Sequence, residues 1–307
     1  MILDIIFLII GFILLVRGAD YFVDGSVILA NRLKIPAIII GLTVVAMGTS
    51  APEAAISIMS AIKDSDAIVV GNVIGSNIAN ILLILGATLL VSKLPIQKNT
   101  LWYELPFVGF ITLLLCSMGL NYGTIARSDA LIFLGLFVLF LGYLYFASKS
   151  QNVPDLDVKD ISDWKIALYL IGGLAILIFG SNLTVDSAIA LARDFGVSER
   201  TIGLTVVAFG TSVPELVTCI VSALKKQTDI AVGNIVGSNI FNILFVLGIT
   251  GTISPILFKQ EFLFDGAFAM LAVTMLMMFG HKNMVLKRWV GICFLAIYVL
   301  YLALLMA

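Results

Sequence analysis

Two glutamates that lie in long apolar segments are the side chains of this sequence best placed to do chemistry. Glu53 is the only charged residue from Pro36 to Ile62, and Glu215 is the only charged residue from Thr201 to Leu224. A carboxylate in a hydrophobic span is costly, so such residues usually mark an ion or substrate path. The duplication of this rare feature makes a merely structural role, such as an interhelical hydrogen bond from a protonated carboxyl, the weaker interpretation.

The same short motif precedes both glutamates. It reads Gly48-Thr49-Ser50-Ala51-Pro52-Glu53 in one place and Gly210-Thr211-Ser212-Val213-Pro214-Glu215 in the other. Glycine and proline interrupt helices, and irregular backbone at membrane depth is tolerated only where it is buried in protein or lines a cavity. The motif therefore predicts interrupted helices and backbone carbonyl groups that are free to face a ligand, those of Ala46, Thr49, Ala208 and Thr211.

A second duplicated motif supplies neutral oxygen atoms. The uncharged runs 67–92 and 230–258 carry the related segments GNVIGSNIAN and GNIVGSNIFN. Residues four apart share one face of a helix, and such pairs are Ser76 with Asn80 and Ser238 with Asn242. The glycines of these segments form GxxxG patterns, which more often mark helix packing than ligand binding.

These side chains predict a site for a hard cation. The candidate donors are carboxylates, hydroxyls, amides and carbonyls, with no histidine or cysteine, which suits Ca²⁺ or Na⁺ and does not suit Zn²⁺ or Cu⁺. Two buried glutamates repel each other, so one would tend to take up a proton in an empty site. One Ca²⁺ neutralises both, and so could two or three Na⁺, which is the behaviour of an exchange site.

The composition indicates an all-α integral membrane protein. Of the 307 residues, 61% are hydrophobic and 12% are charged, too few polar residues to cover a soluble domain of this size. The apolar runs are about 20 residues or longer without alternation, which is typical of helices rather than of a barrel. The net charge of −1 gives no indication of a nucleic-acid partner, and the apolar first segment resembles a retained helix rather than a signal peptide.

The chain repeats itself at a constant offset of 162 residues. We expect a first five-helix repeat over 1–148, a short polar linker over 149–163 and a second five-helix repeat over 164–307. The ten predicted spans are 2–23, 36–62, 67–91, 101–120, 128–147, 164–185, 201–224, 230–253, 262–280 and 287–306. Because five is an odd number, the second repeat enters the membrane from the opposite side, and such inverted repeats are typical of secondary transporters.

Basic residues predict the orientation, since they are enriched in cytoplasmic loops. With both termini outside, the inner loops carry Arg32, Lys34, Lys93, Lys98, Lys149, Lys159, Lys165, Lys225, Lys226, Lys282, Lys287 and Arg288. The outer loops then carry only Lys63, Arg127, Arg193, Arg200 and Lys259. We therefore expect a multi-pass protein of the cell membrane, with the linker in the cytoplasm.

The two duplicated motifs resemble the α-repeats of the cation/Ca²⁺ exchanger superfamily, in particular the short sodium/calcium exchanger family of prokaryotes. The resemblance covers essentially the whole chain. It implies ten helices in two inverted repeats, alternating access, and Na⁺ inflow that drives Ca²⁺ out. Such a protein is a transporter and not an enzyme, needs no cofactor beyond its transported ions, and has no obligate protein partner evident from the sequence.

The resemblance also implies the ligands. A central Ca²⁺ site would use Glu53 and Glu215 with the backbone carbonyls of Thr49 and Thr211. The flanking Na⁺ sites would use the Ala46 carbonyl, Thr49 and Ser76 in one half, and the Ala208 carbonyl, Thr211 and Ser238 in the other. Ser50 and Ser212 belong to the same motifs, and Asn80 matches a family position at the central site.

One position departs from part of the family. Asn242, the counterpart of Asn80, is aspartate in several relatives, including those that co-transport K⁺. Its amide removes a possible third carboxylate, so we expect transport that is independent of K⁺.

Other functions remain open at this stage. H⁺/Ca²⁺ exchange would use the same glutamates, but Asn80 and Asn242 cannot titrate, whereas proton-coupled relatives usually have a carboxylate or histidine there. A cation channel would be expected to have charged rings and a wide pore. A membrane scaffold without transport would have no use for twin buried glutamates.

Overall fold

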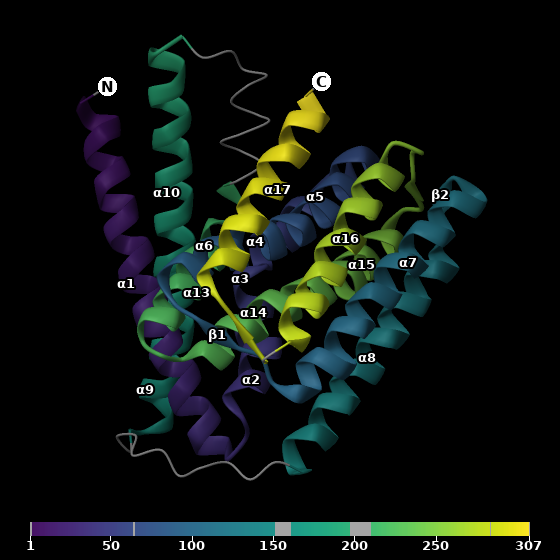
Figure 1. Ribbon diagram of the computed structural model, residues 1–307. Coiled ribbons are helices and arrows are strands. Elements are labelled where there is room, and N and C mark those ends of the chain that lie inside the picture. The colour runs from purple at the N-terminus through teal and green to yellow at the C-terminus, as the bar shows by residue number, and fades with distance from the viewer. Residues whose placement is uncertain (1, 64, 151–160, 197–209, 283, 307) are drawn as a thin grey trace.

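The structure is a computed structural model that describes residues 2–63, 65–150, 161–196, 210–282 and 284–306. It is almost entirely helical (Figure 1). Within the described residues, eight helices are long and apolar enough to span a membrane, and the bent pair Ala37–Thr49 and Ala51–Ile62 makes up to nine. The first part of the predicted span 201–224 lies outside the described residues, and its second part is the short apolar helix Val213–Leu224.

The first half contains helices, short π-helical segments (η) and two short strands. They are α1 (Ile2–Leu33), α2 (Ala37–Ile40), η1 (Gly41–Val45), α3 (Ala46–Thr49), α4 (Ala51–Ile62), α5 (Asp66–Ala79), η2 (Asn80–Leu85), α6 (Gly86–Val91), β1 (Leu94–Pro95), η3 (Thr100–Glu104), α7 (Leu105–Tyr122), β2 (Thr124–Ile125) and α8 (Arg127–Ser150).

The second half follows the same order where it is described. Its elements are α9 (Asp163–Ala167), η4 (Leu168–Gly172), α10 (Gly173–Asp194), α13 (Val213–Leu224), α14 (Thr228–Phe241), η6 (Asn242–Val246), α15 (Leu247–Ile253), β3 (Ile256–Leu257), α16 (Phe262–His281), β4 (Val285–Leu286) and α17 (Arg288–Met306).

The first helix extends further than the sequence predicts. The predicted span ends at Val23, whereas α1 continues as one helix to Leu33. Around the predicted end, the carboxylates of Asp20 and Asp24 both meet Lys225, each at 2.6 Å. The helix therefore continues for ten residues past the predicted span, and its two carboxylates in this region are neutralised by a partner far away in the sequence.

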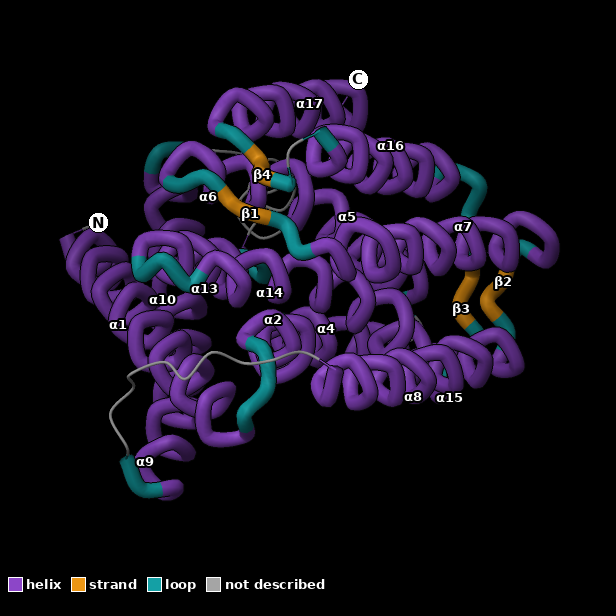
Figure 2. The backbone as a smooth tube through the Cα atoms, turned by 60° about the horizontal axis from the view of Figure 1, so that its bottom comes forward, coloured by secondary structure: helices purple, strands orange, loops and turns teal. Residues whose placement is uncertain are grey.

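Helices α1 and α10 lie side by side along one edge of the molecule (Figures 1 and 2). Glycines allow their backbones to approach closely: a Cβ added to Gly180 would lie 2.7 Å from the Leu15 backbone nitrogen, and one added to Gly173 would lie 2.7 Å from that of Phe22. Packing through small residues is typical of helices in membranes.

The most deeply buried span is formed by α14, η6 and α15. Its apolar window is 94% buried, and that of the equivalent span in the first half is 72% buried. Gly233 and Gly237 of α14 face η1 and its neighbours, where added Cβ atoms would lie 2.6 Å from the carbonyl oxygens of Ile38 and Leu42. In this half, the GxxxG pattern therefore serves close helix packing.

Two short antiparallel sheets join the halves (Figure 2). Leu94 pairs with Leu286, and Thr124 pairs with Leu257. Strand β1 precedes α7 and β2 follows it, so the sheets lie at opposite ends of this helix. The offset of 162 residues maps β1 onto β3, and it maps β2 to within one residue of β4. Each sheet therefore joins the two halves: β1 pairs with β4, the counterpart of β2, and β2 pairs with β3, the counterpart of β1.

Candidate functional site

In each of the two duplicated motifs, the serine departs from helical geometry directly before the helix that carries the glutamate. Ser50 has φ −84° and ψ 9°, and Ser212 has φ −89° and ψ 3°. The helices before and after Ser50 are bent by 48°. Glu53 and Glu215 then lie in the first turns of α4 and α13, where the positive end of the helix dipole stabilises a carboxylate.

The break of each half faces the glutamate of the other. The hydroxyl of Ser50 donates a hydrogen bond of 2.9 Å to Oε1 of Glu215. Ser212 is the equivalent residue of the other half and directly precedes α13. Each glutamate is only 1% exposed. The structure therefore brings the two glutamates together, although they are far apart in the sequence.

Several buried oxygen atoms of this cluster have no hydrogen-bond partner within the described residues. Two are the carboxylate oxygens of Glu53. The others are Glu215 Oε2, Asn80 Oδ1, Asn242 Oδ1 and Ser238 Oγ. Unsatisfied buried polar groups are rare and costly, so their occurrence on residues of both duplicated motifs indicates a site that a cation can complete.

Asn77 and Asn239 hold the amides of Asn80 and Asn242. The Asn80 side-chain nitrogen donates to Oδ1 of Asn239 at 2.9 Å, and that of Asn242 donates to Oδ1 of Asn77 at 3.2 Å. Asn77 and Asn239 also donate to each other's backbone carbonyls, at 3.1 and 3.4 Å. Because their nitrogens are engaged, Asn80 and Asn242 keep their oxygens free to bind a ligand.

This positioning role of Asn77 and Asn239 was not predicted from the sequence. The available signal was their equivalent position in the two copies, three residues before Asn80 and Asn242. The π-helical segments η2 and η6 begin at Asn80 and Asn242 themselves, and such irregularities occur often at functional sites.

The remaining predicted site residues lie in the helices and turns around the two glutamate motifs, except for one that is not described. The Thr49 hydroxyl donates to Oδ1 of Asn234 at 3.0 Å, which connects the first half to α14. Ser76 is buried in α5, at 6% exposure. Thr211 lies in the turn before α13. Ala208 lies outside the described residues.

The Ala46 carbonyl is not free of hydrogen bonds, contrary to the expectation. It accepts the backbone N–H of Ser50 at 3.0 Å and lies 3.5 Å from the Thr49 hydroxyl. The helix break at Ser50 comes too late in the chain to release the Ala46 carbonyl, because α3 remains helical from Ala46 to Thr49. A carbonyl oxygen has two lone pairs, so one remains for a ligand.

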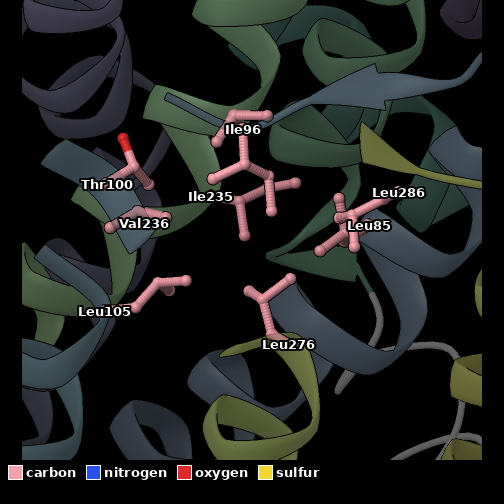
Figure 3. Close-up of a pocket in the computed structure, with 9 residues that line it drawn as sticks. Leu85, Ile96, Thr100, Leu105, Ile235, Val236, Leu276 and Leu286 are labelled. Atoms are coloured by element: carbon pink, nitrogen blue, oxygen red, sulfur yellow. The ribbon is translucent and has the colours of Figure 1, made fainter. Parts of the chain in front are cut away.

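A small apolar void lies elsewhere, between η2, α14, α16 and the start of α7 (Figure 3). Its volume of about 10 Å³ is lined by Leu85, Ile235, Leu276 and other aliphatic side chains, with Thr100 as the polar exception. A cavity of this size and polarity cannot hold a hydrated ion, so it is a packing defect and not part of the ion site.

The donor set suits a hard cation. Within the described residues, no group of three or more histidine, cysteine, aspartate or glutamate side chains could hold a metal ion. The three cysteines are free, and Cys219 is engaged with Asn234 and the Ala231 carbonyl. The cluster consists of two carboxylates with neutral oxygens, which are the ligands that Ca²⁺ and Na⁺ take.

Comparison with known proteins identifies similar sequences and structures. Residues 3–146 and 165–307 match the family model described as sodium/calcium exchanger protein. The chain is 39% identical over 283 residues to the putative antiporter CaxA of Alkalimonas amylolytica, covering 90% of this chain and 88% of that protein. It is 30% identical over 343 residues to the sodium/calcium exchanger MaX1 of Methanosarcina acetivorans, covering 98% of each. The structure superposes on the sodium–calcium exchanger NCX_Mj, soaked without Na⁺ and Ca²⁺, with a TM-score of 0.86 at 30% identity over 99% of both chains.

Proposed function

The chain belongs to the sodium/calcium exchanger family, and we propose that it exchanges Ca²⁺ for Na⁺ across the membrane by alternating access at one shared site. The observation that carries this proposal is the cluster of unpartnered oxygens around Glu53 and Glu215, which come from the two halves of the chain. Two carboxylates balance one Ca²⁺, and they balance Na⁺ ions equally well in the return step. A site that is satisfied by either ion, and unsatisfied when empty, favours exchange over leak.

We assign the ligands as follows. Glu53 and Glu215 bind Ca²⁺ together with the carbonyls of Thr49 and Thr211, and Asn80 lies at the same central position. The flanking Na⁺ sites are formed by the Ala46 carbonyl, Thr49 and Ser76, and by the Ala208 carbonyl, Thr211 and Ser238. Ser50 and Ser212 orient the opposite glutamates, which is supported by the hydrogen bond from Ser50 to Glu215, and Asn242 completes the set as the counterpart of Asn80.

The architecture of this proposal is a ten-helix inverted repeat, with 1–148 and 164–307 as the repeats and 149–163 as the linker. It is supported by the two sheets, each of which pairs a strand of the first half with a strand of the second, and by the reciprocal hydrogen bonds of Asn77 and Asn239. The balance of basic residues supports a cell-membrane protein with both termini outside and a cytoplasmic linker.

Na⁺ coupling without K⁺ is the form of exchange that this donor set favours. Asn80 and Asn242 carry no charge, so the central site has two carboxylates and no third to balance an additional cation. Protons could be carried only by Glu53 and Glu215 themselves, and the neutral amide oxygens beside them suit Na⁺ rather than H⁺.

Uptake of ⁴⁵Ca²⁺ into proteoliposomes tests the proposal. We expect uptake under an outward Na⁺ gradient, no uptake under a pH gradient alone, and the same rate when K⁺ is replaced by choline. Uptake driven by pH alone would replace Na⁺ coupling with H⁺ coupling, and a requirement for K⁺ would show that a third cation is carried. Uptake that needs no counter-ion gradient and does not saturate would identify a channel.

A further inference from the structure

We propose that the cavity between α7 and α8 binds the headgroup of a phospholipid that carries a primary ammonium group. The cavity has a volume of about 490 Å³. It is lined by Trp102, Tyr103, Glu104, Pro106, Phe107, Phe110, Leu136, Leu139, Phe140 and Tyr143. These residues are separate from the cluster around Glu53 and Glu215, and exchange of ions does not explain them.

An incompletely satisfied carboxyl faces this cavity. Glu104 is only 4% exposed, and its Oε1 accepts a hydrogen bond of 3.2 Å from the Tyr143 hydroxyl. Its Oε2 is buried and has no partner within the described residues. A buried carboxylate oxygen without a donor is costly, so an occupant that donates a hydrogen bond or brings a positive charge is strongly favoured here.

The charges of the cavity select the occupant. Its lining contains one acidic side chain and no basic one, so nothing in it offsets the net negative charge of an anionic headgroup, whereas a zwitterionic headgroup brings its own positive charge to Glu104. The faces of aromatic rings attract cations, and Trp102, Tyr103, Phe107, Phe110, Phe140 and Tyr143 supply such rings. An ammonium group can donate a charge-assisted hydrogen bond to Glu104, whereas a choline group has no N–H to donate.

The position of the cavity points to a lipid rather than to a soluble amine. Trp102 and Tyr103 are 49% and 62% exposed, near the N-terminal end of the span Thr100–Asn121. Tryptophan and tyrosine gather where a helix crosses from headgroups to acyl chains. Leu139, on the α8 side, is 70% exposed. The opening therefore faces the bilayer at headgroup depth.

The second half contains a related acid–tyrosine pair. Asp265 of α16 accepts a hydrogen bond of 2.8 Å from Tyr301 of α17. The ring of Phe268 lies 5.0 Å from that of Tyr301 and that of Phe264 lies 6.4 Å from it. The offset of 162 residues places Asp265 one residue away from the position of Glu104. Unlike Glu104, Asp265 has no buried carboxylate oxygen without a hydrogen-bond partner within the described residues, which makes it a matched control.

Native mass spectrometry of the purified, delipidated protein tests this proposal. It would be incubated with phosphatidylethanolamine, phosphatidylcholine or phosphatidylglycerol at equal concentrations. We expect phosphatidylethanolamine to be retained on the wild type, and Glu104→Gln to reduce its retention about tenfold, the equivalent of ~1.4 kcal/mol. Asp265→Asn should retain the lipid as the wild type does.

A second variant keeps the test decisive if Glu104→Gln fails to fold. Leu136→Trp would place a large side chain into the cavity from α8, and it should displace the lipid while Glu104 remains. The proposal would be overturned if the wild type retained phosphatidylglycerol or phosphatidylcholine as well as it retains phosphatidylethanolamine. It would also be overturned if the Glu104→Gln or Leu136→Trp protein retained phosphatidylethanolamine as the wild type does. Because lipid retention is measured without ion transport, the outcome is independent of the proposed exchange.

Discussion

The ammonium group of Lys225 lies 2.6 Å from the carboxylate of Asp24 and ties the end of α13 to α1. Asp20, one turn earlier on α1, lies at the same distance. The offset of 162 residues maps Lys225 onto Lys63 and Asp24 onto Asp186. Within the described part of the chain, Lys63 and Asp186 are exposed and form no ion pair. The two ends of the molecule are therefore in different states: one is tied by charge and the other is not.

Removing this tie should release α1 from α13. Spin labels at Leu33 and Lys226, two exposed residues near the ends of these helices, would report their separation by pulsed electron resonance. We expect the double substitution Asp20→Asn and Asp24→Asn to shift the distance distribution to longer values. Lys63→Ala, the matched control without an ion pair, should leave it unchanged. An unchanged distribution in the double variant would show that the ion pair does not hold the two helices together. The pair is partly exposed, so its effect on unfolding should be at most about 1 kcal/mol.

Glu53→Gln should abolish Ca²⁺ transport and at the same time make the ion-free protein more stable. The substitution removes a buried charge whose two oxygens have no partner, which should raise the free energy of unfolding by about 1–3 kcal/mol. It also removes a ligand, so Ca²⁺ should no longer increase the melting temperature. Thermal unfolding with and without Ca²⁺, together with ⁴⁵Ca²⁺ uptake, measures both effects.

Glu215→Gln should abolish transport in the same way, with a smaller gain in stability. One of its oxygens already accepts a hydrogen bond from Ser50, so less desolvation is left uncompensated. The exposed Glu261 provides the control, since Glu261→Gln should change neither uptake nor stability. Full activity in either site variant would remove that glutamate from the ion site.

Asn77→Ala and Asn239→Ala should weaken Ca²⁺ binding although neither residue is assigned as a ligand. Each variant leaves the amide of Asn242 or Asn80 without the partner that orients it. Loss of such supporting hydrogen bonds typically costs about 10–100-fold in metal affinity. Isothermal titration with Ca²⁺ would measure this, with the exposed Asn121 replaced by alanine as the control. Affinity equal to that of the wild type would show that Asn77 and Asn239 only join the helices.

Gly237→Ala should destabilise the fold through close packing alone. The added methyl group would lie 2.6 Å from the Leu42 carbonyl oxygen and 2.8 Å from the Ala46 Cβ, and overpacking of this kind costs about 1–3 kcal/mol. Gly142→Ala is the control, because no atom lies within 4 Å of its added Cβ. Thermal unfolding in detergent compares the two variants, and equal melting temperatures would show that α14 can move away from η1 at little cost.

Composition and repetition were sufficient to predict the helical membrane fold and most of its spans. Apolar runs of the right length predicted the helices, and the two copies of the glutamate motif predicted that distant residues meet. The structure confirms the helical fold and brings Ser50 to Glu215. It does not describe Ala208, which stays a prediction.

Most contacts that the sequence does not reveal join residues that lie far apart in the chain. The pairing of Asp20 and Asp24 with Lys225 could not be predicted, because Lys225 follows about 200 residues later and no local pattern reveals it. The interlocked amides of Asn77 and Asn239 are likewise contacts between the halves. The position of the break relative to Ala46 depends on backbone hydrogen bonds within a single turn, which glycine and proline locate only approximately.

The two short sheets restrict how this protein can deliver an ion from one side of the membrane to the other. Each sheet joins the first half to the second, and the N–H groups of Ile96 and Phe258 extend the pairing with hydrogen bonds of 2.8 and 2.9 Å. A rocking motion that separated the halves as two rigid bodies would have to break pairing at both ends of α7. The strand pairing thus favours a transport cycle in which the two halves remain joined at both ends of α7.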